Sequence, residues 1–277
     1  MKKKILVTGA GGFIASHLVE DLLLNNYQVK ALVHYNSKSF LGWLENSNFK
    51  ENHNLEIILG DIRDPYFIDK VMIDVDKVLH LAALIAIPYS YVSPNSYIDT
   101  NIKGTLNLLN SSLKNNINKF IHTSTSEVYG TAQYVPINEE HPLNAQSPYA
   151  ASKIAADQLV LSYYKSFDLK ATVIRPFNTY GPRQSLRAVI PTIIQQHIYG
   201  GEEIKLGSLT PTRDFNYIKD TINGFKAAML DSSINGEVIN LCSNFEISIS
   251  ETNKIISDCL NSKKQILQQD DRLRPQK

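Results

Sequence analysis

A tyrosine and a lysine four residues apart, Tyr149 and Lys153, open an apolar-periodic run over residues 154–164. Positions i and i+4 of a helix lie on one face, so the phenol and the ammonium should point into the same space. A tyrosine that acts as a base near neutrality needs its pKa lowered by roughly 3 units, or about 4 kcal/mol, and one nearby cation supplies about 1–4 kcal/mol. Lys153 alone is therefore marginal, and a second positive charge would help. Such a pair by itself also occurs among ordinary surface residues, so its meaning depends on the rest of the chain.

Hydroxyl and carboxylate groups follow a predicted strand at residues 119–122. Thr125, Ser126 and Glu127 stand there, at the carboxyl end of a strand, where α/β proteins place their chemistry. A Ser/Thr-rich strand exit is also an ordinary turn. The functional interpretation rests on Tyr149, because a strand end and a helix start can converge.

The chain opens with a predicted strand (3–8), a glycine-rich turn and a helix (16–26). Gly9 would make the tight turn, and Gly12 would let the backbone approach a pyrophosphate at the helix N-terminus. Ala15 replaces the third glycine of the dinucleotide fingerprint, where only close packing is at stake. The pattern predicts dinucleotide binding, with Phe13 and Ile14 beside the glycines. An oxidised nicotinamide ring would then be the second cation.

The type of dinucleotide is poorly specified. The second strand (28–33) ends without the carboxylate that usually holds a ribose 2′-hydroxyl. It also lacks an arginine for a 2′-phosphate, although Lys38 is close. We expect NAD and leave NADP open. After the third strand (55–59), Asp61 could accept from an adenine amino group, with Ile62 beside it, or could merely close a turn. The fourth strand (77–81) ends in small residues that leave room for a cofactor, and the expected contacts there are Leu81, Ala82 and Ala83.

Strands and helices alternate over residues 2–175, with a sixth strand at 169–175, which predicts an α/β fold with a doubly wound parallel (Rossmann) sheet. A long helix is expected at 94–114, where Asn101 is by default a satisfied core amide. We place the dinucleotide-binding domain at 1–176 and a smaller C-terminal α/β lobe, for substrate, at 177–277. That lobe should hold helices at 188–199, 219–230 and 250–260 and strands at 203–206 and 238–241.

Composition limits the function classes. The chain has 28 basic and 27 acidic residues, a net charge of +1, which gives no electrostatic case for nucleic acid or an anionic membrane. We expect no signal peptide, because a strand pattern follows the basic N-terminus at once. Cys242 and Cys259 lack metal-site spacing and are expected to be reduced, in a cytoplasmic protein without a metal site.

Taken together, these residues resemble the extended short-chain dehydrogenase/reductases that act on nucleotide sugars. The resemblance spans nearly the whole chain, and its markers are residues 8–14, 80–83, the Tyr149/Lys153 pair, 175–178 and 213–215. Thr125-Ser126-Glu127 is similar to the triplet of the 4,6-dehydratases, whereas epimerases usually lack the glutamate. Segments 42–45, 83–89 and 185–194 resemble the N-acetylglucosamine 4,6-dehydratases of legionaminic-acid-type pathways, which use GDP- or UDP-linked sugars.

The resemblance implies a role for each group. Tyr149 takes the proton of the sugar 4-hydroxyl, Lys153 holds the nicotinamide ribose and lowers the pKa of the tyrosine, and Thr125 bonds the 4-oxygen. Glu127 removes the C5 proton, water leaves from C6, and hydride returns to C6. A serine is too weak an acid to protonate the leaving hydroxyl, so we expect Glu127 to deliver that proton with Ser126 or a water as relay. The residues expected to hold the nucleotide diphosphate are Asn178, Arg213 and Arg274.

Two further functions stay open from the sequence. A C4 epimerase needs only Thr125, Tyr149 and Lys153, and a regulatory protein could use the same fold to bind a dinucleotide without catalysis. Family members are often homodimers through the helices expected at 94–114 and 148–167. They also usually continue some tens of residues past the segment at 272–275, whereas this chain stops at Lys277, so we expect the substrate lobe to be shortened.

Overall fold

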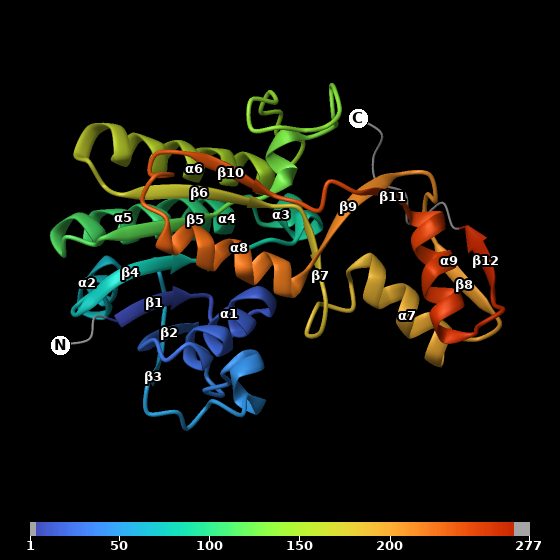
Figure 1. Cartoon of the computed structure of the whole chain (residues 1–277), viewed down its shortest axis with the longest axis horizontal. Helices are drawn as coiled ribbons and strands as arrows, with labels where there is room; N and C mark the ends of the chain where they lie inside the picture. Colours follow the sequence, from blue (N-terminus) through green and yellow to red (C-terminus); the bar gives the residue numbers. More distant parts are fainter. Residues whose placement is uncertain (1–3, 269–277) are drawn as a thin grey trace. The chain divides into compact units, whose positions relative to one another are not determined.

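The computed structural model describes residues 4–268, and a parallel β-sheet lies at its centre (Figure 1). The sheet has seven strands in the order β10-β6-β5-β4-β1-β2-β3. Their bounds are Lys4–Thr8 (β1), Val29–His34 (β2), Leu55–Gly60 (β3), Val75–His80 (β4), Lys119–Thr123 (β5), Ala171–Pro176 (β6) and Val238–Leu241 (β10). The predicted doubly wound α/β sheet is confirmed, and each strand lies within a residue or two of its predicted bounds.

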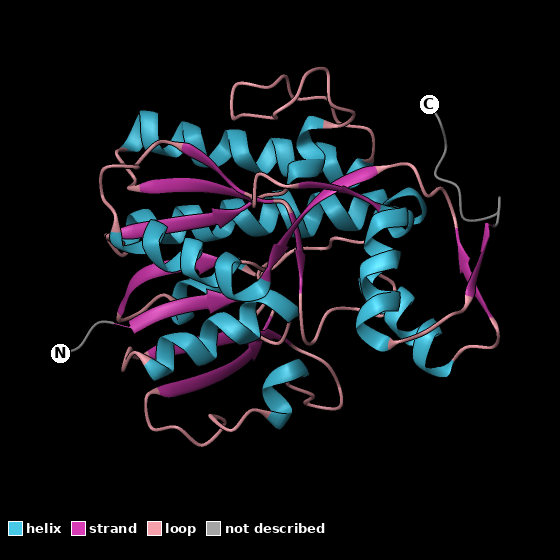
Figure 2. Ribbon diagram, turned by 45° about the vertical axis from the view of Figure 1, so that its right-hand side comes forward, coloured by secondary structure: helices cyan, strands magenta, loops and turns pink. Residues whose placement is uncertain are grey.

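Helices cover both faces of this sheet (Figure 2). On one face α1 (Phe13–Leu24) packs against α8 (Ile218–Leu230). On the other, α5 (Gly104–Lys114) packs between α2 (Pro65–Val71) and α6 (Pro148–Phe167). Strands covered on both faces are apolar on both sides, which is why the predicted strands read as continuous apolar runs rather than as alternating patterns.

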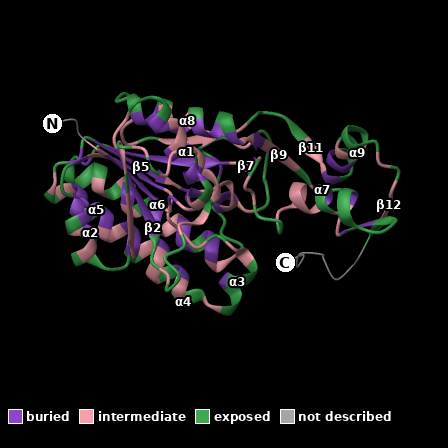
Figure 3. Ribbon diagram, turned by 90° about the horizontal axis from the view of Figure 1, so that it is seen from below, coloured by how far each residue is buried: buried purple, intermediate pink, exposed green. Residues whose placement is uncertain are grey.

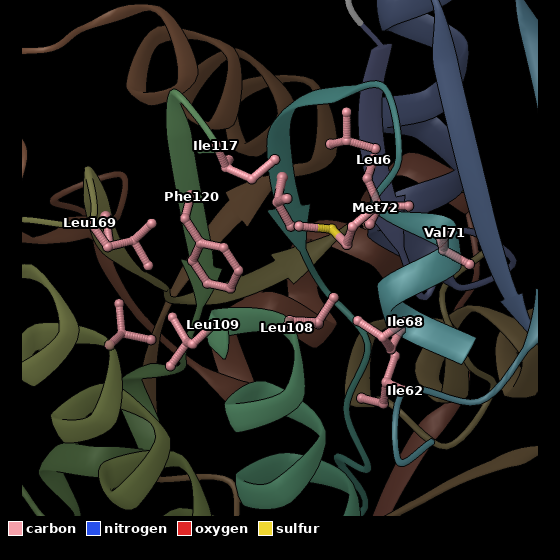
Figure 4. Close-up of a cluster of buried hydrophobic side chains, with 14 of the residues drawn as sticks. Leu6, Ile62, Ile68, Val71, Met72, Leu108, Leu109, Ile117, Phe120 and Leu169 are labelled. Atoms are coloured by element: carbon pink, nitrogen blue, oxygen red, sulfur yellow. The ribbon is translucent and has the colours of Figure 1, made fainter. Parts of the chain in front are cut away.

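The main core lies between the sheet and the layer of α2 and α5 (Figure 4). Leu108 and Leu109 of α5 face Phe120 of β5, and all three are fully buried. Burying a side chain of this size stabilises the fold by roughly 1.5–3 kcal/mol. Figure 3 shows the buried positions gathered in the strands of the sheet. Within residues 4–268, no helix is both long and apolar enough to cross a bilayer.

The strand order reverses beside β1, which pairs with β2 on one side and with β4 on the other. The register places Thr8 opposite Leu32 of β2 and His80 of β4. In doubly wound sheets the crevice for ligands opens at the carboxyl ends of the strands where the order reverses. The segments that follow β1, β4 and β5 therefore share one edge of the sheet.

The long helix predicted at 94–114 is interrupted. It consists of α4 (Pro94–Tyr97), a π-helical segment (Ile98–Lys103) and α5. π-Bulges are rare and are often found at functional sites. Here the bulge places Asn101, whose side chain is 1% exposed, beside the loop that leaves β4.

The division of the chain corrects the single boundary that we predicted at residue 176. Residues 218–241 belong to the first unit, since β10 pairs in parallel with β6 and α8 packs on the sheet. Among the described residues, the second unit contains 178–217 and 242–268. The sequence shows no sign of this return, because a strand at a sheet edge looks the same whichever sheet it joins.

The second unit has two small sheets, ordered β11-β9-β7 and β12-β8. Its core consists of four apolar residues from helices and strands, Ile193, Ile204, Leu206 and Ile249. Its elements are β7 (Asn178–Tyr180), α7 (Val189–Tyr199), β8 (Glu203–Leu206), β9 (Thr212–Tyr217), β11 (Glu246–Ser248), α9 (Ile249–Leu260) and β12 (Gln265–Gln268). The sequence predicted α7, β8 and α9 but missed the strands β7, β9, β11 and β12, two of which have only three residues.

Candidate active site

The helix α6 places the tyrosine and the lysine as predicted. Ser147 caps its N-terminus, with the side chain accepting a hydrogen bond from the Ala150 amide, and Pro148 occupies the first turn. Proline suits this position because its missing N–H would have no helical partner there. Tyr149 and Lys153 follow one turn apart on the same face and are 6% and 3% exposed. Both polar ends are therefore held in a largely dry environment.

The segment after β5 brings the predicted hydroxyl and carboxylate groups to Tyr149. A short 3₁₀ helix, η3 (Ser126–Tyr129), follows the strand, and the Thr125 hydroxyl accepts from the Glu127 amide at 3.2 Å. Thr125 also hydrogen-bonds the Tyr149 side chain, and the Glu127 charge acts on the same phenol. Ser126 is half-buried at the start of η3. Thr125, Glu127 and Tyr149 are thus brought together from two elements.

Burial decides the protonation of the tyrosine in this structure. It raises the pKa of Tyr149 above its ordinary value of 10, while the hydrogen bond with Thr125 lowers it and the nearby carboxylates of Glu127 and Asp157 raise it. Our expectation that Lys153 would lower this pKa is not met here. The outcome follows from the cost of placing a phenolate in a dry site, which exceeds what the surrounding groups offset.

Lys153 is anchored to the end of β5. Its Nζ donates a hydrogen bond to the Thr123 carbonyl oxygen at 2.5 Å. Burial lowers the pKa of Lys153 from 10.5 to about 8, and the charge of Asp157 opposes that fall. The ammonium is therefore fixed in position and close to its titration point at physiological pH.

The turn between β1 and α1 has the geometry expected of a glycine cradle. Gly9 has φ +68°, a conformation that side chains disfavour, and a Cβ there would lie 2.8 Å from the Cα of Ala82. A Cβ on Gly11 would lie 2.7 Å from the Leu41 carbonyl oxygen. Gly12 is the extended N-cap of α1, with no side chain bonded over the helix end. Phe13 and Ile14 form its first turn, so their amides face a surface without a side-chain cap.

The loop after β4 is fixed beside this turn. The amides of Leu81 and Ala82 both donate to the Thr8 hydroxyl at 3.1 Å. Asn101 pairs with both backbone groups of Leu84 and donates to the Ser152 hydroxyl at 2.9 Å. The default interpretation of Asn101 as a satisfied buried amide is confirmed, and it ties this loop, which begins with Leu81, Ala82 and Ala83, to α6.

Asp61 closes a turn, which was the alternative to an adenine contact. Its Oδ1 accepts from the Arg63 amide at 2.9 Å, and the Arg63 guanidinium lies 2.5 Å from Oδ2. This pair lowers the pKa of Asp61 and takes up much of its capacity as an acceptor. Ile62 is buried next to it. Asp64 caps α2 before Pro65.

The second unit contains two of the residues predicted for the nucleotide diphosphate. Asn178 begins β7, and its side-chain amide donates to the Asp214 carbonyl oxygen at 3.4 Å. Arg213 lies on β9, which pairs with β7, and its Nη1 donates to the Thr212 carbonyl oxygen at 2.6 Å. The third residue, Arg274, lies outside the described residues.

Comparison with known proteins assigns the chain to a family. The family model described as GDP-mannose 4,6 dehydratase matches residues 6–276. The chain belongs to the GDP-mannose 4,6 dehydratase family. The mouse dTDP-D-glucose 4,6-dehydratase is 34% identical over 256 residues, which cover 91% of this chain and 71% of that protein. The predicted resemblance to the extended short-chain enzymes of nucleotide sugars is confirmed at this level.

Solved structures of similar proteins include both reaction types. One is the UDP-N-acetylglucosamine 4-epimerase of Methanobrevibacter ruminantium in complex with UDP-N-acetylmuramic acid, with TM-score 0.88, 35% identity and coverage of 100% of this chain and 88% of that one. Another is the dTDP-glucose 4,6-dehydratase of Streptomyces venezuelae with NAD bound, with TM-score 0.86, 26% identity and coverage of 98% and 86%. Proteins similar to this chain thus include both dehydratases and epimerases, so similarity alone does not fix its reaction.

The sequence did not reveal three buried titratable and charged side chains that lie beneath this site. Asp157, His122 and Arg175 are buried below Lys153. From the sequence, Arg175 was recognised only as part of the segment 175–178 that resembles the family. The spacing offered a signal, because Asp157 follows Lys153 by four residues, as Lys153 follows Tyr149.

Proposed function

We propose that this protein is an NAD(P)-dependent nucleotide-sugar 4,6-dehydratase that converts GDP- or UDP-N-acetylglucosamine to the 4-keto-6-deoxy sugar. The observation that carries the proposal is the convergence of Thr125 and Glu127 on the phenol of Tyr149. Oxidation at C4 needs a base at the 4-hydroxyl, and elimination across C5 and C6 needs a second base one carbon away. The site offers both kinds of group.

The residues around the β1–α1 turn fit a dinucleotide. Cβ atoms at Gly9 and Gly11 would clash with the backbone of Ala82 and of Leu41, so glycine at both positions lets these segments pack closely beside the N-terminus of α1, which no side chain caps. A pyrophosphate suits such a helix end because free amides and the helix dipole favour an anion. We propose that Gly9, Gly12, Phe13 and Ile14 hold it, with Leu81, Ala82 and Ala83 beside the nicotinamide and Asp61 and Ile62 near the adenine. When bound, NAD supplies the hydride acceptor for C4 and the donor for C6.

The chain's own residues would move the protons. Tyr149 takes the proton of the 4-hydroxyl while Thr125 positions the oxygen, and Lys153 holds the ribose. The 4-ketone acidifies C5–H, and Glu127 takes that proton. Glu127 then returns it to the leaving 6-hydroxyl, with Ser126 or a water as relay, so that water departs. As hydride reduces C6, C5 takes up one proton. This uptake balances the proton that Tyr149 accepted from the 4-hydroxyl, so the protein returns to its starting state.

The substrate class rests on the resemblance of three segments and on the second unit. The segments are residues 42–45, 83–89 and 185–194, which resemble N-acetylglucosamine 4,6-dehydratases. We propose that Asn178 and Arg213 hold the diphosphate of the nucleotide sugar, because an amide and a guanidinium both donate to phosphate oxygens. We propose the same role for Arg274, outside the described residues.

A 4-epimerase is the second candidate. The Methanobrevibacter ruminantium epimerase at 35% identity favours it, and the reaction needs only Thr125, Tyr149 and Lys153. The two reactions differ in the mass of their product. Incubation with NAD and each of GDP- and UDP-N-acetylglucosamine should give a product lighter by one water. A product of unchanged mass with inverted C4 would establish the epimerase, and cofactor binding without turnover would favour a regulatory protein.

We also propose that the protein is a homodimer through the helices at 94–114 and α6. Large apolar side chains are exposed on or next to these helices, among them Tyr91, Ile98, Tyr164 and Phe167. Light scattering at micromolar concentration should give twice the mass of 31.1 kDa. A monomer mass across that range would contradict the proposal.

A further inference from the structure

A buried carboxylate lies one helical turn below the Tyr149–Lys153 pair. Asp157 is 0% exposed and continues the same face of α6, since Tyr149, Lys153 and Asp157 follow one another at intervals of four residues. A carboxylate in a dry interior is costly unless charge and hydrogen bonds compensate it. The groups that compensate the Asp157 carboxylate therefore indicate its role.

The Asp157 carboxylate is held by three side chains from β5, its exit and β6. Oδ2 accepts from the Ser124 hydroxyl at 2.9 Å and from Nε and Nη2 of Arg175 at 3.2 and 3.0 Å. On the other side, Oδ1 lies 3.4 Å from Nε2 of His122. The contacts of Oδ2 fix the carboxylate under the site, whereas Oδ1 and both ring nitrogens of His122 have no hydrogen-bond partner among residues 4–268.

Arg175 is fixed in turn. Its Nη1 donates to the Tyr129 hydroxyl at 2.9 Å, and its guanidinium carbon lies 5.0 Å from the centre of the Tyr129 ring. The Tyr129 hydroxyl donates to Asn240 of β10 at 2.8 Å. The scaffold below Asp157 thus extends from η3 to the edge strand of the sheet.

The charges around this carboxylate do not cancel. The titratable and charged groups that act on Asp157 or Lys153 are His80 (β4), His122 (β5), Tyr149 (α6) and Arg175 (β6). Behind them, Glu127 acts on Tyr149 and Tyr129 bonds Arg175. Burial lowers the pKa of His122 to about 4 and that of His80 well below its usual value, so both rings are neutral near pH 7. Two buried cations, Lys153 and Arg175, are then left with one buried carboxylate, Asp157.

We propose that Asp157 is a positioning residue for the reaction, because its fixed carboxylate keeps the buried Lys153 ammonium charged on the Thr123 carbonyl oxygen. The charge of Asp157 opposes the fall that burial imposes on the pKa of Lys153, and it is the only side-chain charge found to do so within residues 4–268. Without it, Lys153 would be neutral near pH 8 and would no longer offer an ammonium to the ribose of the cofactor. The role in catalysis rests on the proposed function, whereas the effect on Lys153 does not.

The direct test measures the ionisation of Lys153 by NMR of protein labelled with ¹³C at lysine Cε, with the signal assigned by its loss in Lys153→Met. The variant is Asp157→Asn, which keeps the size and an acceptor for Arg175 and removes the charge. We expect the pKa of Lys153 to fall by at least about one unit, since an opposite charge at close range commonly shifts a pKa by 1–3 units. An unchanged pKa in folded Asp157→Asn would overturn the proposal.

The matched control is Asp99→Asn. Asp99 also pairs with a lysine four residues away, Lys103, at 2.6 Å, but both side chains are exposed. This variant should leave the pKa of Lys153 unchanged. A shift as large as that of Asp157→Asn would mean that the signal does not report on the buried carboxylate and would also overturn the proposal.

A reciprocal measurement covers the case in which Asp157→Asn does not fold. Coupling between two sites is mutual, so removing the lysine charge in Lys153→Met should raise the pKa of Asp157, read from its ¹³Cγ shift, by the same amount. An Asp157 titration that is the same in Lys153→Met and the wild type would contradict the proposal.

Kinetics separate this inference from the proposed function. In active enzyme, Asp157→Asn should lower kcat about tenfold or more at pH 8 and leave KM for the nucleotide sugar unchanged. The alkaline limb of the profile of kcat against pH should shift to lower pH. Asp157→Glu, which keeps the charge, should recover part of the loss. An unshifted pH profile would indicate a purely structural role. If the wild type turned over no nucleotide sugar, the proposed function would fail while the NMR titration would still decide the role of Asp157.

Discussion

The Nζ of Lys153 donates a hydrogen bond to the Thr123 carbonyl oxygen at 2.5 Å, which joins α6 to the carboxyl end of β5. The bond links the helix that bears Tyr149 to the strand exit that bears Thr125 and Glu127. Because both elements are anchored in the core, the groups proposed for the two proton transfers keep a fixed separation.

Lys153 should reduce stability at neutral pH. Its pKa is about 8 in the folded protein against 10.5 for the free side chain, so the unfolded state binds more protons between these values. The cost is full below pH 8 and disappears as pH rises toward 10.5. Lys153→Met should thus be more stable at pH 7, by on the order of 3 kcal/mol, and the difference should shrink by pH 10. Urea unfolding at several pH values measures this, and a pH-independent difference would contradict it.

Tyr149 should ionise far more readily with oxidised cofactor than without it. Burial holds its pKa above the usual value in the protein alone, and a cationic ring nearby would favour the phenolate. The check is an ultraviolet titration with and without NAD⁺, in which the same titration of Tyr149→Phe is subtracted to remove the other tyrosines. Identical difference curves in the two conditions would show that the cofactor has no such effect.

Glu127 and Ser126 should differ in their importance. A group that transfers a proton contributes about 10²–10⁴-fold to a rate, so Glu127→Gln should lose at least about a hundredfold in kcat. Ser126→Ala should lose less, because a water can replace a relay. The measurement is kcat for formation of the 4-keto product. Equal losses in the two variants would argue against Glu127 as the donor to the leaving hydroxyl.

Gly9 should tolerate no side chain. An alanine there would adopt φ +68° and press against the Ala82 backbone, which should cost about 1–3 kcal/mol and weaken binding of NAD. Gly201→Ala is the control, because a Cβ at that position meets nothing within 4 Å. Thermal unfolding and calorimetric titration with NAD measure the two effects. Equal thermal stability and equal affinity for NAD in the two variants would contradict the proposal that the turn at Gly9 holds the cofactor.

The sequence predicted the parts of the fold and site that depend on local pattern. Apolar runs identified the strands, and the spacing of Tyr149 and Lys153 placed both on one face of α6. It could not predict that residues 218–241 return to the first sheet, because strand pairing is a long-range choice. Nor could it give the pKa of Tyr149, since we counted the attraction of Lys153 but not the cost of burial, which is larger.

The proposal that this protein is a 4,6-dehydratase is tested most directly by following a deuterium atom from C4 of the substrate into the product. With GDP- or UDP-N-acetylglucosamine deuterated at C4, a 4,6-dehydratase moves the deuterium within one molecule from C4 to C6 of the 4-keto-6-deoxy product. NMR and mass spectrometry of the product should find it at C6. Deuterium that returns to C4 of a sugar of unchanged mass would contradict the account and leave an epimerase.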